Sequence, residues 1–210
     1  AVYTKNGEED TLDGDAILLA TGRGPNTEGL HAERAGVELT KRGAVVTDKH
    51  LRTTAENIWA AGDVCGNLQF TYISLDDSRI ILSDMQGDGS RTTENRGAFA
   101  YSVFMEPSFS RVGLSEKEAA DKGLNYRVVR MNTDMIPKAK VLRKTTGMLK
   151  AVIDKDSGKI FGAALFCPES YEIINMVKLA MDHDLDYTVL RDFIYTHPTM
   201  SEGLNDLFAL

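Results

Sequence analysis

Two apolar, strand-like segments joined by a short polar turn set the strongest limit on how this chain can fold. Residues 148–153 and 159–166 carry mostly apolar and strand-forming side chains, and residues 154–158 between them include two aspartates, a serine and a glycine. Apolar runs bounded by such turn residues predict a β-hairpin. The second half of the chain must therefore build an antiparallel sheet and cover at least one of its faces.

Further elements are expected around this hairpin. Strands are predicted at residues 99–104 and 126–131, and the capping-box pair Ser115 and Glu118 predicts the start of a short helix. Residues 169–183 predict a longer helix. Its apolar positions recur at helical spacing, at Ile173, Ile174, Val177, Ala180 and Met181. Strands and helices in this order predict an α+β layout with an antiparallel sheet.

The first half contains short apolar runs that end at polar residues or glycine, at 15–20, 44–46 and 58–61. A run that is apolar on every side indicates a strand covered on both faces, as in a parallel sheet. This pattern applies to the run at residues 15–20, and residues 44–46 and 58–61 are expected to form two more strands.

A domain boundary is expected near the middle of the chain. Asn6-Gly7 predicts an early hairpin turn, and residues 78–86 predict a helix. The polar, glycine-rich residues 87–93 follow this helix. Because such segments separate domains, the parallel-sheet pattern and the antiparallel pattern are expected to belong to different domains.

The charge and cysteine content exclude several classes of protein. The chain has 24 Lys and Arg against 31 Asp and Glu, a net charge of −7. This balance argues against a nucleic-acid or anionic-membrane binder, because phosphate contact needs clustered basic residues. Cys65 and Cys167 cannot form a disulfide framework and are expected to be passive thiols. With no secretory signal or apolar run of membrane-spanning length, a cytoplasmic protein is expected.

Asp63 is the first candidate site residue, because it stands where an apolar run ends at Gly62. In parallel sheets, ligands lie beyond the carboxyl ends of the strands. A carboxylate there can accept hydrogen bonds from sugar or sugar-alcohol hydroxyls, and Gly62 would let a ligand approach the backbone. The alternative is a plain strand-ending turn in which Asp63 caps the residues that follow.

His197 and Glu202 form the second candidate site, within the run HPTMSE at residues 197–202. Thr199 and Glu202 match a capping box, which predicts a last helix starting at Thr199 and gives Glu202 a structural role. The same geometry brings Glu202 close to His197, where a carboxylate would fix the imidazole tautomer for acid/base work. Such a pair lacks a nucleophile nearby in sequence, and chemistry alone leaves both interpretations open.

The remaining signals carry less chemistry. His31, His50 and His183 have no partner at metal-ligand spacing, so no metal site is expected. The glycines at residues 22–24 lack the third glycine of a dinucleotide fingerprint. Basic residues at 138–144 are expected to form a solvated loop, or else to contact an anion.

Three motifs occur in a fixed order: ATGRGPN at residues 20–26, IWAAGDV at 58–64 and HPTMSE at 197–202. Together they resemble the C-terminal half of the flavoprotein disulfide reductases, the family of glutathione reductase, dihydrolipoamide dehydrogenase and mercuric reductase. The stretch at residues 68–74 and the ending at 203–208 look similar to the branch linked to resistance to reactive chlorine and hypothiocyanous acid. The resemblance covers essentially the whole chain.

The resemblance implies a domain order. Residues 1–25 would end an NAD(P)-binding domain, residues 26–96 would form the C-terminal part of an FAD-binding domain, and residues 97–210 would form a dimerisation domain. The expected fold is thus an α+β dimerisation domain, with an antiparallel sheet and helices, preceded by a partial α/β FAD- and NAD(P)-binding portion.

The resemblance also implies roles for particular residues. Asp63 would bind the ribityl chain of the flavin, with Gly62 and Thr71 as further cofactor-binding residues. His197 and Glu202 would be an acid/base dyad that serves the redox cysteines of the other subunit of a homodimer, which supplies the missing nucleophile. A cis peptide bond is expected before Pro198.

Several family motifs are absent from these 210 residues: the N-terminal GxGxxG, the CxxxxC redox disulfide and the second glycine fingerprint. The chain is therefore expected to be a fragment of an FAD- and NAD(P)H-dependent reductase. Its substrate would be a small disulfide or another oxidant. Alone, the fragment is expected to bind neither cofactor and to be inactive. The alternative is a stand-alone dimerisation module with no catalytic activity of its own.

Overall fold

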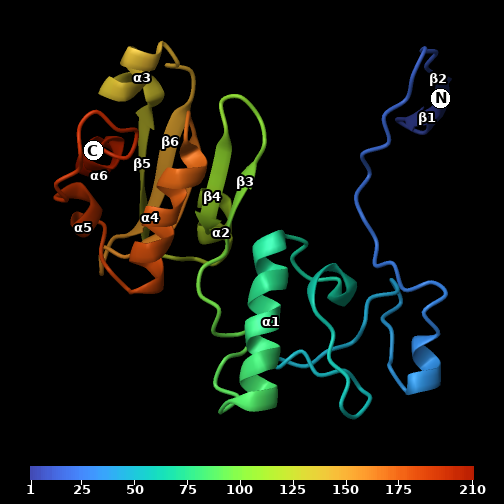
Figure 1. The fold of residues 1–210 in the computed structure, drawn as a ribbon. Coiled ribbons are helices and arrows are strands. Elements are labelled where there is room, and N and C mark those ends of the chain that lie inside the picture. The colour runs from blue at the N-terminus through green and yellow to red at the C-terminus, as the bar shows by residue number, and fades with distance from the viewer. The chain divides into compact units, whose positions relative to one another are not determined.

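The predicted hairpin lies at the centre of a five-stranded antiparallel sheet in the computed structural model, which describes residues 1–210 (Figure 1). The hairpin strands are β6 (Met148–Asp154) and β7 (Ile160–Phe166). The outer strands are β3 (Ala100–Val103), β4 (Phe109–Gly113) and β5 (Tyr126–Asn132), and the strand order is β3-β4-β7-β6-β5. The predicted antiparallel sheet is therefore confirmed.

The turn of this hairpin is built by Asp154. Its carboxylate accepts hydrogen bonds from Ser157 Oγ at 2.6 Å and from the backbone N–H of Asp156 at 3.1 Å. The bond from Ser157 is the main reason that the pKa of Asp154 is lowered. An Asp side chain that accepts a hydrogen bond from the backbone two residues ahead is common in such turns. The polar residues 154–158 therefore form the hairpin turn that the sequence predicts.

Helices cover one face of the sheet, and Figure 1 draws α4 in front of it. Helix α4 (Ser170–Asp182) contacts β3, β4 and β7, and α6 (Gly203–Ala209) contacts β5 and β6. The short helix α5 (Thr188–Arg191) lies between them in sequence and contacts both. The apolar stripe predicted for α4 is confirmed at its buried positions, Ile173, Ile174, Val177 and Ala180.

Three short helical segments complete this part of the chain. They are α2 (Glu116–Asp121), the 3-10 helix η3 (Thr133–Met135) and α3 (Pro137–Leu142). The predicted capping box at the start of α2 is confirmed, because Ser115 and Glu118 exchange hydrogen bonds of 2.7 and 3.2 Å. The backbone bond from Ser115 is the main cause that lowers the pKa of Glu118 to about 2.

A cluster of serine hydroxyls joins α4 to the sheet. Ser170, the first residue of α4, lies 2.8 Å from the hydroxyls of both Ser108 and Ser110. Ser110 also meets Ser102 on the neighbouring strand at 2.8 Å. Ser108, Ser110 and Ser170 are buried, and each has a partner, as buried hydroxyls require.

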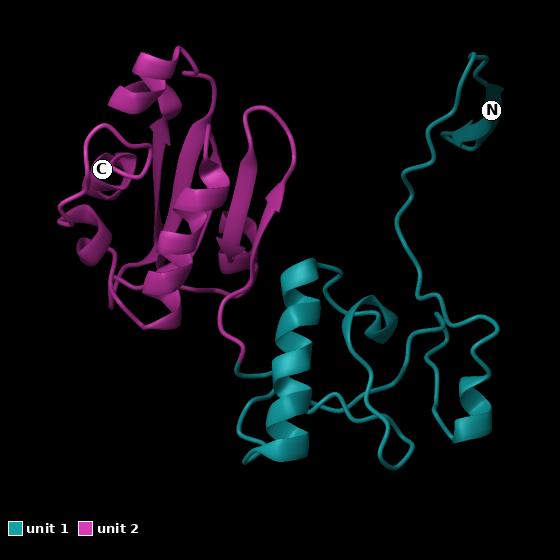
Figure 2. Cartoon of the chain, viewed as in Figure 1, with its two compact units in different colours: residues 1–95 teal, residues 96–210 magenta.

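The chain divides into two units, residues 1–95 and residues 96–210 (Figure 2). In the first unit, β1 (Val2–Lys5) and β2 (Glu8–Thr11) form a hairpin. Its two-residue turn is Asn6-Gly7, with φ of 54° and 88°. Both values lie in the left-handed region that Asn and Gly tolerate, so the predicted turn is confirmed.

The prediction of three strands from the apolar runs of the first half is wrong, because none of these runs forms a regular strand. Residues 15–20 have no strand partner, and Ile17, Leu18 and Leu19 are exposed. Residues 44–46 and 58–61 form only isolated bridges. The physical reason is that a strand needs a neighbour to satisfy its backbone N–H and C=O groups, and these 210 residues contain none for residues 15–20.

Helix α1 (Thr71–Gln86) is longer than the helix predicted at residues 78–86. The prediction missed its first two turns because Asp76 and Asp77 interrupt the apolar pattern. Both aspartates are buried, and each accepts a hydrogen bond: Asp76 from Arg91 and Asp77 from the backbone of Gly62. Two 3-10 helices, η1 (Ala32–Ala35) and η2 (Gly62–Cys65), complete the unit.

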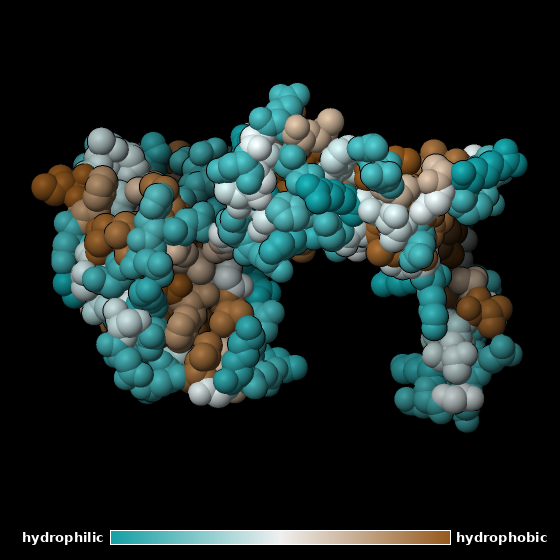
Figure 3. All heavy atoms as spheres, turned by 90° about the horizontal axis from the view of Figure 1, so that it is seen from below, coloured by the Kyte–Doolittle hydropathy of each residue, from teal (hydrophilic) through white to brown (hydrophobic).

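Apolar side chains also reach the surface of the second unit. Figure 3 shows brown, hydrophobic residues among hydrophilic ones on the face it presents. The most exposed large apolar side chains of this unit include Phe104, Val141, Leu179 and Ile194. No helix has the length and apolarity needed to cross a lipid bilayer.

Candidate functional site

His197 and Glu202 lie side by side in the loop between α5 and α6. His197 Nδ1 is 2.7 Å from Glu202 Oε2. The Glu202 side chain is only 14% exposed, whereas the His197 side chain is 69% exposed. The structure therefore brings the two predicted residues together, with the carboxylate held inside and the imidazole facing outward.

The loop that carries His197 is anchored by side chains of its own domain. The amide nitrogen of Asn205 donates to the carbonyl oxygens of Leu190, Arg191 and Phe193 at 3.2, 2.7 and 3.0 Å. The hydroxyl of Tyr195 also donates to Leu190 O, at 3.1 Å. Asn205 and Tyr195 were not identified from the sequence, because their partners are backbone carbonyls that leave no sequence pattern.

The last helix begins four residues later than predicted. Thr199 Oγ1 accepts a bond of 3.3 Å from the backbone N–H of Glu202, which is one half of the predicted capping box. The other half is missing, because the Glu202 carboxylate binds His197 instead, and α6 starts at Gly203. The peptide bond between His197 and Pro198 is cis, as the family resemblance implies.

The chemistry of this pair follows from the hydrogen bond. An ionised carboxylate only accepts hydrogen bonds, so Nδ1 carries the hydrogen and its N–H donates the hydrogen bond to Glu202. Nε2 of the neutral ring is then left as an acceptor that can take up a proton. The arrangement can act as a general base and, once protonated, as a general acid.

Neither cysteine of the chain is suited to be the nucleophile of this pair. Cys65 and Cys167 are both buried, and neither is part of a disulfide. Burial raises the pKa of Cys167 to about 12, so its thiol stays protonated at neutral pH. Because the thiolate is the reactive form, this burial makes Cys167 a poor nucleophile in the folded chain.

Gly62, Asp63 and Thr71, the residues expected to bind the flavin, lie on two neighbouring elements of the first unit. Gly62 and Asp63 begin η2, and Thr71 begins α1, which contacts η2. Gly62 is buried, whereas Asp63 and Thr71 are exposed. The exposed carboxylate of Asp63 can therefore receive hydrogen bonds from a ligand.

The donor set of these residues fits a polyol with an attached phosphate. A carboxylate accepts hydrogen bonds from hydroxyls, while Thr71 and the first N–H groups of α1 can donate to phosphate oxygens. Gly62 has a φ of 74°, and a Cβ there would lie 2.8 Å from Ser74 Oγ. Only glycine therefore lets this turn sit so close to α1.

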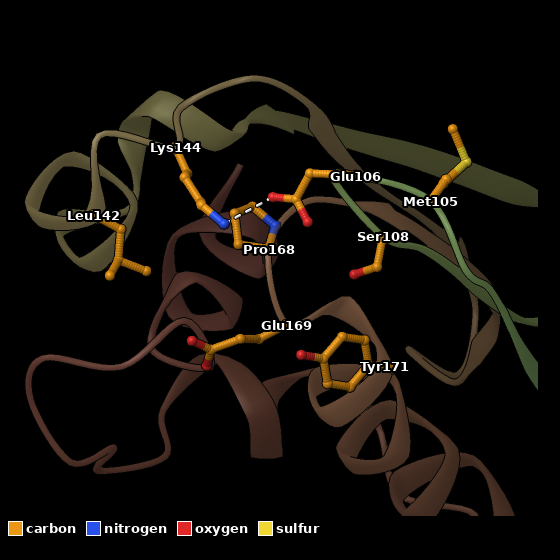
Figure 4. A pocket seen from close by; sticks show the side chains of 8 residues that line it. All are labelled: Met105, Glu106, Ser108, Leu142, Lys144, Pro168, Glu169 and Tyr171. Atoms are coloured by element: carbon orange, nitrogen blue, oxygen red, sulfur yellow. Dashed lines mark hydrogen bonds and ion pairs between the residues drawn. The ribbon is translucent and has the colours of Figure 1, made fainter.

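A separate pocket of about 270 Å³ lies in the second unit, away from the predicted site residues (Figure 4). Lys144 and Glu106 point toward one another at its rim, with Lys144 Nζ 2.9 Å from Glu106 Oε1. Lys144 belongs to the basic segment 138–144 predicted as a solvated loop, but residues 138–142 of that segment lie in helix α3. The pairing with Glu106 reduces the positive charge that this segment could offer to an anion.

Two protein-family models match the chain. The dimerisation domain of the pyridine nucleotide-disulphide oxidoreductases matches residues 99–208, and the pyridine nucleotide-disulphide oxidoreductase model matches residues 1–78. The chain therefore belongs to the pyridine nucleotide-disulphide oxidoreductase family. The predicted family and the predicted fold class, a dimerisation domain preceded by part of a nucleotide-binding portion, are confirmed.

Individual proteins of this family are also similar to the chain. The chain is 53% identical, over 93% of its length, to the probable pyridine nucleotide-disulfide oxidoreductase RclA of Escherichia coli K12. It is 36% identical, over 95% of its length, to a mercuric reductase of Staphylococcus aureus, of which it covers 36%. Among solved structures, the HOCl-induced flavoprotein disulfide reductase RclA from E. coli matches 100% of the chain with a TM-score of 0.93 and 50% identity.

The chain spans less than half the length of each of these relatives. It covers 44% of the E. coli RclA sequence and 48% of the chain in the solved RclA structure. The resemblance to the branch linked to reactive chlorine is therefore confirmed for the part of the protein present here.

Proposed function

We propose that this chain is the C-terminal part of an FAD- and NAD(P)H-dependent disulfide reductase-like enzyme. In this proposal, His197 and Glu202 are the acid/base pair for redox cysteines carried by the other subunit of a homodimer. The observation that carries the proposal is the 2.7 Å bond that joins the exposed imidazole of His197 to the largely buried carboxylate of Glu202. Residues 1–25, 26–96 and 97–210 would be the end of the NAD(P)-binding domain, part of the FAD-binding domain and the dimerisation domain.

Each residue has one task in this mechanism. Bound FAD supplies the redox chemistry that links NAD(P)H to the cysteine pair. Nε2 of His197 takes a proton from the attacking thiol and returns it to the departing one, while Glu202 holds Nδ1–H and so fixes the tautomer. Asp63 accepts hydrogen bonds from the ribityl hydroxyls, Gly62 allows close approach, and Thr71 donates at the start of α1.

The substrate class follows from the relatives. Their names include a mercuric reductase and an HOCl-induced disulfide reductase, and we propose a small disulfide or another low-molecular-weight oxidant as the acceptor. A cytoplasmic protein that binds neither nucleic acid nor membrane accords with the net charge of −7. We further propose that residues 1–210 alone bind no FAD and have no reductase activity.

The dyad is tested by kinetics on the full-length enzyme. Replacing His197 with Gln is expected to lower kcat/KM with a disulfide substrate by roughly 10²- to 10⁴-fold, the usual contribution of a positioned acid/base group. His183→Gln is the matched control, because His183 is exposed at the end of α4, outside the proposed site. A His197→Gln enzyme with more than half of the parent kcat/KM would contradict the proposal.

Action across the dimer is tested with mixed dimers. One subunit carries His197→Gln with intact redox cysteines, and its partner carries intact His197 with the cysteines replaced by serine. If the dyad acts across the interface, the mixed dimer regains one working site, and its activity exceeds that of either parent homodimer. Absence of any recovered activity in isolated mixed dimers would mean that His197 serves its own subunit.

The second candidate is a dimerisation module without catalytic activity. It is favoured by the match of residues 99–208 to a dimerisation domain and by the burial of both cysteines. Reductase activity of the full-length parent distinguishes the two candidates, and light scattering on the 210-residue chain tests whether it forms a dimer. A stable dimer whose full-length parent also shows no reductase activity would favour the module.

A further inference from the structure

We infer that Asp77 is a positioning residue for the proposed flavin site. Its buried carboxylate holds the turn formed by Gly62 and Asp63 against α1, so that the Asp63 carboxylate faces outward to a polyol ligand. This inference rests on the proposed function. It adds a residue that neither the sequence motifs nor the family resemblance assigned to the site.

The direct contact is a hydrogen bond in the interior. The backbone N–H of Gly62 donates to Asp77 Oδ2 at 2.8 Å, and Asp77 is 3% exposed. Bonds to a charged acceptor are stronger than neutral ones, and removing the acceptor would leave a buried N–H without a partner. The position of Gly62 therefore depends on Asp77.

The shape of the contact restricts the turn further. A Cβ on Gly62 would lie 2.8 Å from Ser74 Oγ, so Gly62 is seated directly on the helix. Ser74 and Asp77 are three residues apart in α1 and lie on the same side of it. Asp63, one residue after this seat, is exposed. The direction of its side chain is thus set by the contact of Gly62 with α1.

The segment that leads into the turn at Gly62 and Asp63 is bound by the same side of α1. Asp84 lies seven residues after Asp77, two turns along the helix. Its carboxylate accepts bonds of 2.7 and 2.6 Å from Arg52 and of 2.9 Å from Trp59 Nε1. Two carboxylates on α1 therefore bind the segment from residue 52 to residue 62 at three residues, Arg52, Trp59 and Gly62. Asp76, by contrast, binds Arg91.

This geometry separates a positioning role from a charge effect. If Asp77 acts by accepting the Gly62 N–H, an asparagine in its place can still accept through its carbonyl oxygen. Alanine cannot. Asp77→Asn should therefore restore most of what Asp77→Ala loses.

The experiment is an FAD titration of the apo full-length enzyme, followed by flavin fluorescence, with unfolding midpoints recorded in parallel. Asp77→Ala is expected to raise the dissociation constant of FAD about tenfold or more, which is the scale of one lost hydrogen bond to a charged group. Asp77→Asn is expected to stay within about threefold of the parent. Asp76→Asn is the matched control: it alters the neighbouring buried carboxylate and should leave the affinity unchanged.

Four outcomes decide the inference. An Asp77→Ala enzyme that folds and binds FAD with the parent affinity overturns it, as does an equal loss in Asp76→Asn. If Asp77→Ala fails to fold, Asp77→Ser replaces it with the same expected loss, because the shorter side chain cannot reach Gly62. The variant Asp63→Ala separates a failure of the proposed flavin site from a failure of the role inferred for Asp77. If that variant keeps the parent affinity, the proposed flavin site itself fails. If it binds weakly while Asp77→Ala binds normally, only the role of Asp77 fails.

Discussion

Ile194 should be a main contributor to the proposed homodimer. It lies three residues before His197, and its side chain is 94% exposed. The next residue, Tyr195, turns inward, where its hydroxyl donates to Leu190 O, so the two neighbours face opposite ways. If His197 acts on cysteines of the other subunit, the exposed side chain beside it must lie against that subunit.

The loss of dimerisation free energy can be estimated from the apolar carbons that the substitution removes. Replacing Ile194 with Ala removes three carbons, which costs about 2.4 kcal/mol at about 0.8 kcal/mol for each buried carbon. A two-fold interface contains the residue twice, so the dimer would lose up to about 5 kcal/mol. At about 1.4 kcal/mol for each factor of ten, the dissociation constant would rise by up to roughly 3,000-fold.

The assay is the molar mass as a function of concentration, measured by light scattering on the parent and on Ile194→Ala. Leu82→Ala is the matched control, because Leu82 is an exposed apolar residue of α1 outside the residues 99–208 that match the dimerisation domain. The control should dimerise like the parent.

The reasoning would be refuted by an Ile194→Ala protein whose dissociation constant lies within about threefold of the parent. Such a result would mean that Ile194 stays in water in the dimer. The proposed approach of the partner to His197 would then have to be abandoned, whatever the oligomeric state.

Three further results are expected. Native Cys167 should resist alkylation at pH 8, because a pKa of about 12 lowers its thiolate fraction roughly a thousandfold relative to an ordinary thiol; rapid labelling of its peptide in mass spectrometry would be inconsistent with this. Glu118→Gln should destabilise the protein above pH 4.5, and this difference should vanish as the pH falls through about 2, because a lowered pKa gives stability that is lost on protonation; a pH-independent difference in urea unfolding would argue against the cap. Leu165→Ala should cost about 3 kcal/mol in the same urea assay, since Leu165 is fully buried in β7; a loss below about 1 kcal/mol would mean that the core adapts.

Elements stabilised by neighbours in sequence were predictable. The hairpin of β6 and β7 and the capping box of α2 depend on side chains a few residues apart, so the sequence contains both partners. The same holds for the pair His197 and Glu202, which is five residues apart and meets at 2.7 Å. Their catalytic role stays a prediction, because contact alone does not reveal which group they serve.

Elements that depend on distant partners were not predictable. The apolar run at residues 15–20 satisfies the pattern of a buried strand, but this chain offers it no neighbouring strand. The first turns of α1 were missed for the opposite reason. Asp76 and Asp77 look incompatible with a buried helix face until Arg91 and the backbone of Gly62 are placed beside them. Asn205 was missed because all three of its acceptors are backbone oxygens.

The serine cluster beneath α4 has a consequence for how accurately this helix is placed. Apolar contacts fall off gradually, so a helix resting only on Ile173 and Val177 could rotate or slide slightly at little cost. Hydrogen bonds are directional, and a small rotation of Ser170 would break its bonds to Ser108 and Ser110 together. The three hydroxyls therefore fix one orientation of α4 on the sheet, among several orientations that would bury a similar apolar area.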